Sequence, residues 1–268
     1  MTWRAWLVWS AIGAVLALLY LPLAPPLFFS LLPETAAEPA PTLRWYVEMW
    51  RNPVLTGAIV TCMQAAVIVA VATPLLALVA AISIRELKMP RLVLGLMLLP
   101  LLVPGVSMGI AAAFFFKQIG IAPSLVTIVI VQILWALPFA LLVVLTAMST
   151  FDPVLTEAAH MSGAGRWRAF RDIELPLIWP GVSGAATFSF ILSFNETVRT
   201  ALVQGPLNTV QTYIWSTYKQ IGLSPTLYAL MTLLILLTVG LSAIAVTIRR
   251  VCRLSCASGP SSSPHARR

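Results

Sequence analysis

The apolar positions of this chain gather in long runs separated by short polar segments, and this pattern predicts helices that cross a membrane. A helix needs about 20 predominantly apolar residues to cross the hydrocarbon layer of a bilayer. Six segments approach or exceed this length: residues 5–29, 57–84, 92–116, 123–148, 177–195 and 226–248. We therefore expect an all-α membrane protein with six transmembrane helices.

Prolines interrupt two of these predicted spans. Three prolines between positions 22 and 26 end or kink the first span, and Pro100 and Pro104 break the third. Proline lacks a backbone N–H donor and clashes with the carbonyl one turn earlier. Within a membrane, such a break is tolerated where neighbouring helices or a cavity satisfy the freed carbonyl groups. The third span is therefore either a kinked structural helix or a broken helix that lines a pathway.

The segments outside the spans divide the chain into three regions. Residues 1–56 hold a first span and an extracytoplasmic loop. The length of the apolar segment favours a retained span over a cleaved signal peptide. The aromatic residues of the loop are suited to a membrane interface. Residues 57–250 form the core membrane domain, in which apolar positions between 210 and 221 recur at helical spacing and predict a short amphipathic helix at the membrane surface. Residues 251–268 are rich in Ser and Pro, and we expect a disordered cytoplasmic tail.

Composition supports a membrane protein and excludes several other classes. The chain is 59% hydrophobic with a mean hydropathy of +0.92, well above an ordinary soluble domain. Its net charge of +8 is not read as a nucleic-acid signal, because in a membrane protein the location of the charges matters more. Three scattered cysteines give no disulfide framework, and Cys252, Cys256 and His265 lack the spacing and fourth ligand of a metal site. We expect no metal and no cofactor.

The distribution of Lys and Arg predicts the orientation. With six spans, both termini lie on one side, together with the loops at 85–91 and 152–176. Twelve of the 17 Lys and Arg residues fall on that side and five on the other. Because cytoplasmic loops carry an excess of Lys and Arg, both termini and these loops are expected in the cytoplasm.

One polar segment, residues 152–176, differs from an ordinary loop, and we call it the island. It holds seven charged side chains in a chain that is only 10% charged. A charge at the bilayer centre costs about 2.5–3.5 kcal/mol, so the island lies outside the hydrocarbon. Its small side chains at Ala158 and Ala159 would let another protein approach closely, and Gly163 follows where a helix would turn. We interpret the island as a docking element; a polar loop that merely links two spans is the alternative.

The island resembles the EAA loop of ABC importer permeases. Its matching positions, at the family's spacing, are Glu157, Ala158, Ala159, Gly163, Ile173, Leu175 and Pro176. The resemblance implies a type I ABC importer (MetI-like) permease fold, in which this loop is a coupling helix seated in a cleft of an ATP-binding subunit. It further implies that Glu157 and Gly163 act in coupling. Arg166 would pair with acidic groups of that subunit, although the positive-inside rule explains it equally well.

A polar stripe near the end of the fifth span is the candidate substrate pathway. Ser189, Ser193 and Glu196 recur at positions i, i+4 and i+7, and so share one helical face. The stripe should face a water-filled cavity or another helix. Glu196 either attracts a cationic solute or closes a gate, or it is simply solvated at the interface and paired with Arg199 at i+3. Gln64 and Gln132, each alone in a span, are expected to form hydrogen bonds between helices.

These observations predict a transport subunit without an ATPase site of its own, because the chain has no G-x-x-x-x-G-K-[ST] loop. The resemblance implies a bacterial inner-membrane importer with a cytoplasmic ABC ATPase dimer that binds the ATP, an extracytoplasmic solute-binding protein and a second permease subunit, which we expect to be non-identical. Residues 188–196 are similar to spermidine/putrescine-type permeases, which favours a small cationic or polyamine-like solute. A stand-alone secondary carrier and a non-transporting membrane scaffold remain the alternatives.

Overall fold

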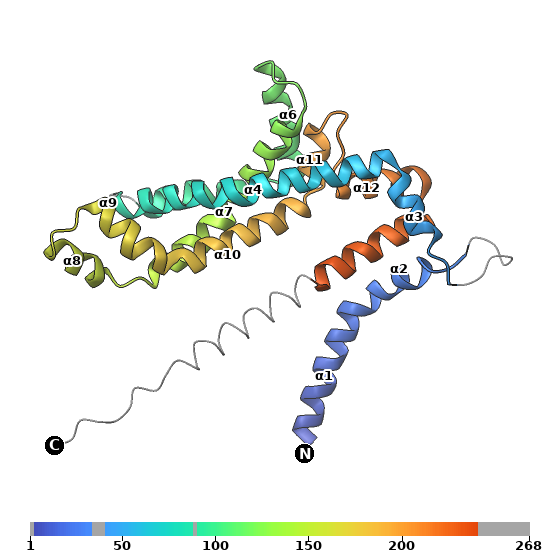
Figure 1. Cartoon of the computed structure of the whole chain (residues 1–268), viewed down its shortest axis with the longest axis horizontal. Coiled ribbons are helices and arrows are strands. Elements are labelled where there is room, and N and C mark those ends of the chain that lie inside the picture. Colours follow the sequence, from blue (N-terminus) through green and yellow to red (C-terminus); the bar gives the residue numbers. More distant parts are fainter. Residues whose placement is uncertain (1–2, 34–40, 88–89, 241–268) are drawn as a thin grey trace. The chain divides into compact units, whose positions relative to one another are not determined.

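The computed structural model describes residues 3–33, 41–87 and 90–240 of the chain. Over these ranges the chain is helical and contains no strand, as the sequence predicts. Contacts group the described residues into two compact units, one formed by those up to 51 together with those from 221 onward, and one formed by those between 52 and 220. Figure 1 shows the helices of both units in chain order.

The first unit contains the N-terminal apolar segment and the last described helix. Its elements are α1 (Trp3–Tyr20), the 3₁₀ turn η1 (Leu21–Leu23), α2 (Ala24–Phe29), α3 (Arg44–Arg51) and an apolar helix over Pro225–Gly240. The prolines between 22 and 26 produce the predicted interruption, since α1 gives way to η1 and α2 there. Hydrogen bonds join α3 to the end of this segment, with Trp45 Nε1 donating to the Leu32 carbonyl at 2.9 Å and Tyr46 Oη to Ser30 Oγ at 2.9 Å.

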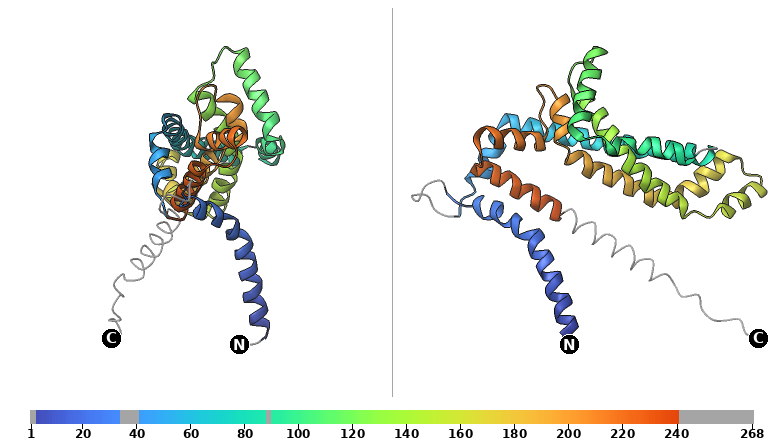
Figure 2. Two further views of the ribbon diagram at one scale, coloured as in Figure 1. Left: turned by 90° about the vertical axis from the view of Figure 1, so that its right-hand side faces the viewer. Right: turned by 180° about the vertical axis from the view of Figure 1, so that it is seen from behind.

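The second unit is built on three long helices that pack along one another, α4 (Pro53–Glu86), α7 (Leu125–Ser149) and α10 (Leu175–Phe194) (Figures 1 and 2). They correspond to the predicted second, fourth and fifth spans. Their shared core is rich in alanine, with Ala77, Ala140 and Ala185 fully buried. At Gly181 a Cβ atom would lie only 2.1 Å from the Cβ of Ala147, so α10 and α7 approach closely because no side chain separates them there.

Capping residues set the beginnings of these helices. The Asn52 side chain accepts hydrogen bonds from the backbone N–H groups of Val54 and Leu55, with Pro53 in the first turn, where its missing donor costs nothing. At the start of α7, Ser124 and Thr127 satisfy each other's backbone N–H groups in a capping box. The local sequence therefore accounts for both starting points.

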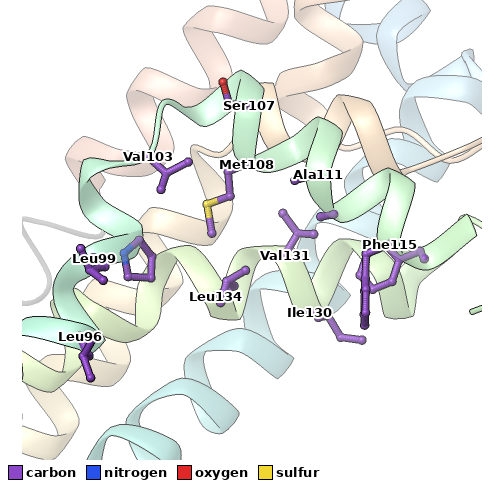
Figure 3. A pocket seen from close by; sticks show the side chains of 13 residues that line it. Leu96, Leu99, Val103, Ser107, Met108, Ala111, Phe115, Ile130, Val131 and Leu134 are labelled. Carbon is purple, nitrogen blue, oxygen red and sulfur yellow. The ribbon is translucent and has the colours of Figure 1, made fainter. Parts of the chain in front are cut away.

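The predicted third span is two helices at a sharp angle rather than one kinked helix. It consists of α5 (Pro90–Leu98), the 3₁₀ turn η2 (Leu99–Leu102) and α6 (Gly105–Gln118), with a bend of 98° between the two arms. Pro100 and Pro104 frame the break, because neither can continue the backbone hydrogen bonds of a helix. The arms and α7 enclose an apolar pocket, seen in Figure 3, whose lining includes Met108 and Leu134.

Four described helices are long and apolar enough to cross a membrane, or five if the bent pair counts as one span. The predicted sixth span, 226–248, is described only as far as residue 240, within the apolar helix Pro225–Gly240. The predicted tail at 251–268 lies outside the described residues, and the division of the chain at residues 56 and 250 stays a prediction. The expected amphipathic helix is present as α12 (Val210–Ile221); its place at a membrane surface also stays a prediction.

Candidate functional site

The island folds into two short helices and a wide turn at one end of the second unit. These are α8 (Pro153–Met161), α9 (Arg166–Ala169) and the π-helical turn η3 (Phe170–Glu174), which continues into α10. Figure 1 shows α8 and α9 at the end of the long helices away from α11 (Val198–Val203) and α12. Asp152 begins α8 by accepting a hydrogen bond from the Val154 N–H at 3.0 Å.

Gly163 ends α8, as the sequence predicts. Its φ is +82°, a left-handed conformation that glycine adopts without steric cost. The Gly163 N–H donates to the His160 carbonyl and the Ala164 N–H to the Ala159 carbonyl, both at 3.0 Å, which is the hydrogen-bond pattern of a Schellman motif. His160 Nδ1 lies 2.9 Å from the Ala164 carbonyl oxygen. This turn ends α8 and sets its direction relative to α9.

The structure brings part of the proposed coupling set together. Ala158, Ala159 and Ile173 line a hollow of about 380 Å³ on one side of α8. Glu157 and Arg166 are exposed, and neither makes an ion pair within the described part of the chain. Large apolar side chains are exposed beside them, with Met161 at 90% and Trp167 at 71%. The island thus combines free charges with uncovered apolar surface.

Leu175 and Pro176 lie where the π-turn passes into α10. The Leu175 N–H donates to the Phe170 carbonyl, five residues earlier instead of four. Pro176 has no N–H, and in an uninterrupted α-helix its ring would clash with the carbonyl four residues before it. A wider turn relieves that crowding, and such π-turns are frequent at functional sites.

Sequence reasoning missed the charged pair that this turn creates. Glu174 in η3 is buried, and its carboxylate is bonded by Arg85 from the end of α4, with Nη2 3.3 Å from Oε2 and Nη1 on Oε1. The available signal was a carboxylate placed between Ile173 and Leu175, directly beside an apolar span. A charge in that position either reaches solvent or finds a partner.

The proposed pathway residues lie in a buried polar cluster at the other end of α10. Ser193 Oγ donates to Gln132 Oε1 at 2.6 Å, and Gln132 Nε2 donates to Thr200 Oγ1 at 2.9 Å. The prediction that Gln132 joins helices is confirmed, whereas Gln64 is exposed. The Ser189 hydroxyl is buried and has no hydrogen-bond partner among the described residues. In this conformation Ser193 thus faces the neighbouring helix α7.

Glu196 forms the expected pair with Arg199, but the pair is buried rather than solvated. Arg199 donates to Glu196 from its backbone N–H at 2.9 Å and from Nη1 at 2.8 Å, so both carboxylate oxygens are bonded. The two side chains are 7% and 9% exposed. The guanidinium carbon lies 3.8 Å from the ring centre of Trp135, and a Cβ at Gly105 would lie 3.1 Å from that carbon. Trp135 and Gly105 carried no signal in the sequence.

No three His, Cys, Asp or Glu side chains are placed to hold a metal ion anywhere in residues 3–33, 41–87 and 90–240. Cys252, Cys256 and His265 lie outside these ranges.

A protein-family model described as "Binding-protein-dependent transport system inner membrane component" matches residues 21–251. The chain belongs to this family. It is therefore a membrane component of a transport system, as its resemblance to ABC importer permeases predicts. The match begins within the first apolar segment and includes the island and the buried polar cluster.

Individual relatives and a solved structure agree with this family assignment. The chain is 27% identical to the spermidine/putrescine permease protein PotC of Escherichia coli K12 over 199 residues, covering 74% of this chain and 75% of that protein. It is 24% identical to PotC of Haemophilus influenzae over 209 residues, or 77% and 81% of the two chains. A chain in the crystal structure of a bacterial alginate ABC transporter, in complex with an alginate pentasaccharide-bound periplasmic protein, superposes with a TM-score of 0.64 at 16% identity, covering 91% of this chain and 93% of that one. The predicted permease fold is confirmed.

Proposed function

We propose that this chain is the transmembrane permease subunit of an ABC importer that couples to a separate cytoplasmic ATPase through the island. The observation that carries this proposal is the uncovered face of the island in a chain of the transport family. Met161 and Trp167 expose apolar surface outside the predicted spans, and such patches mark contact sites for other proteins. The free charges of Glu157 and Arg166 beside them give the patch a polar rim.

Each coupling residue has a distinct role in this proposal. The small side chains of Ala158 and Ala159 leave the hollow beside α8 open to a partner's side chain. Gly163 holds α8 in a fixed direction, so that less conformational entropy is lost on docking. Ile173 contributes an apolar side chain to the lining of the hollow, while Leu175 and Pro176 connect the island to α10. Movement of the ATPase would then rotate α10 directly.

The importer requires partners that this chain does not supply. We propose a cytoplasmic ABC ATPase dimer that binds the ATP, a second and non-identical permease subunit, and an extracytoplasmic solute-binding protein. The alginate transporter, whose structure includes a periplasmic protein, supports the last of these. The excess of Lys and Arg on the side of the island supports a cytoplasmic position for the island and both termini, where an ATPase could reach the island.

The pathway is proposed to pass Ser189, Ser193 and Glu196, and the solute to be a small cation of the polyamine type, as the similarity to PotC suggests. Arg199 bonds both oxygens of Glu196, and the Glu196 side chain is only 7% exposed, so that carboxylate is paired and largely inaccessible to a solute in this conformation. We therefore assign Glu196 to a gate, which opens when the pair with Arg199 separates. The unpartnered hydroxyl of Ser189 is then available to the solute.

Glu157→Lys tests the coupling proposal. The tagged chain would be purified in mild detergent from its own membranes, and co-purifying subunits identified by mass spectrometry. We expect an ATP-binding subunit with the unchanged chain, and its loss with Glu157→Lys at an unchanged amount of membrane-inserted permease. Glu86→Lys is the matched control, since Glu86 is an exposed carboxylate at the same end of the unit but outside the island. Equal recovery of the ATPase with both variants would refute the role of Glu157, and recovery of no ATPase with the unchanged chain would refute the proposed function.

A further inference from the structure

Glu174 is a buried charge that has no role in the docking of the island as proposed above. Its side chain is 4% exposed, whereas that of its partner Arg85 is 45% exposed. A buried carboxylate is costly unless it is paired, so its presence beside an apolar span calls for a reason. Arg85 lies 89 positions earlier, near the end of α4, and two of its guanidinium nitrogens donate to the two carboxylate oxygens.

The π-turn explains why Glu174 faces α4. One extra residue in a helical turn rotates the side chains before it by about 100° relative to those after it. Within η3, Arg171 and Asp172 remain exposed and pair with each other at 2.9 Å, while Glu174 turns inward. The same turn that accommodates Pro176 therefore presents one carboxylate to the end of α4.

The pair lies where the island meets the three long helices. A pocket of about 540 Å³ is lined by Arg85 and Glu174 together with Thr156 and His160 of α8 and Trp167 of α9. From there α4 runs along both α7 and α10. The island is thus joined to α10 by the continuous chain, and to α4 by the Arg85–Glu174 pair.

We propose that the Arg85–Glu174 pair is a mechanical joint that makes α4 move together with α10 when an ATPase displaces the island. This inference rests on the proposed function. In this proposal Arg85 and Glu174 are positioning residues, because they act on the movement of α4 and not on solute or nucleotide. Without the pair, the island acts directly on α10 alone. The helix α4 is then moved only through its apolar contacts with α10, which slide more easily than a two-point ion pair.

The test measures the relative movement of the two helices in the purified complex with its ATPase. Spin labels would be attached to cysteines introduced at the exposed positions Ser83 on α4 and Ser183 on α10, with the native cysteines replaced. Their distance would be compared in the nucleotide-free and the ATP–vanadate-trapped complex. In the unchanged protein we expect the same distance between the labels in both states. In Glu174→Gln we expect this distance to shift, or its distribution to broaden, on trapping. The rate of ATP hydrolysis should stay within about twofold of that of the unchanged protein.

Asp172→Asn is the matched control, since it removes an exposed carboxylate from the same π-turn. If the Glu174→Gln variant does not assemble, the charge-reversed pair Arg85→Glu/Glu174→Arg replaces it, and this pair should behave as the unchanged protein does. Identical distances in Glu174→Gln and Asp172→Asn would overturn the joint. So would a charge-reversed pair that assembles with the ATPase while the distance between α4 and α10 still changes on trapping. Either of these results would leave the proposed docking through Glu157 standing. If the unchanged chain bound no ATPase, both the docking proposal and the joint would be overturned.

Discussion

The guanidinium of Arg199 lies on the face of Trp135, with 3.8 Å between its central carbon and the ring centre. The cation thus has an aromatic ring on one side and the carboxylate of Glu196 bonded to it, and both charged side chains are nearly inaccessible. Gly105 leaves room for this arrangement at the bend of the broken third span. Three separate segments therefore meet at one buried cation.

Breaking this pair should destabilise the fold more than replacing both of its members. Glu196→Gln leaves the Arg199 cation buried and without a compensating charge, which costs about 3–5 kcal/mol. Glu196→Met/Arg199→Met removes both charges and keeps apolar contact with Trp135, so we expect a smaller loss. Thermal unfolding in detergent, followed by the loss of monodisperse protein, would rank the variants. A double variant less stable than Glu196→Gln would contradict this account.

The close approach of α10 to α7 depends on Gly181. A Cβ there would lie 2.1 Å from the Cβ of Ala147, closer than real side chains come, so Gly181→Ala forces the helices apart. Overpacking of this kind costs about 1–3 kcal/mol. Gly184→Ala is the control on the same helix, because its nearest atom, Val143 Cγ1, would lie at an ordinary 4.0 Å. We expect a lower unfolding temperature for Gly181→Ala and little change for Gly184→Ala. Equal effects would show that the contact of Gly181 with Ala147 does not limit how closely α10 and α7 pack.

The long helices were predictable because their signals are local. The segment 57–84 was expected to cross the membrane and α4 covers Pro53–Glu86, while 123–148 became α7 at Leu125–Ser149. Runs of apolar residues and caps such as Asn52 determine these elements within a few neighbouring positions. Gly163 was predictable for the same reason, since a glycine after a short helical segment is the usual way to end it.

The 98° bend and the buried ion pairs depend on contacts between distant parts of the chain. Prolines reveal that the third span breaks, but not the angle of the break. The arm α6 packs closely on α11, with Gly109 against Leu202, and periodicity does not report such contacts. Glu174 was missed because its partner is 89 positions away and because the π-turn, not the regular helical period, decides which way it points. Glu196 and Arg199 were predictable as a pair, but their burial was not, since Trp135 approaches from another helix.

The direction of α8 should matter for docking as well as for stability. Gly163→Ala places a side chain at φ +82°, where non-glycine residues are disfavoured by about 1–2 kcal/mol. The space around Gly163 is open, so the backbone is strained while no neighbouring atom is displaced. If the Schellman turn holds α8 ready for an ATPase, that cost appears as weaker docking, about 5–30-fold in affinity. Gly165→Ala is the control, since Gly165 has a φ of −69° and open space around it as well. Titration of the purified permease with its ATPase would measure both affinities. A normal affinity for Gly163→Ala, with the fold intact, would mean that the island adjusts to its partner on binding rather than being held ready for it.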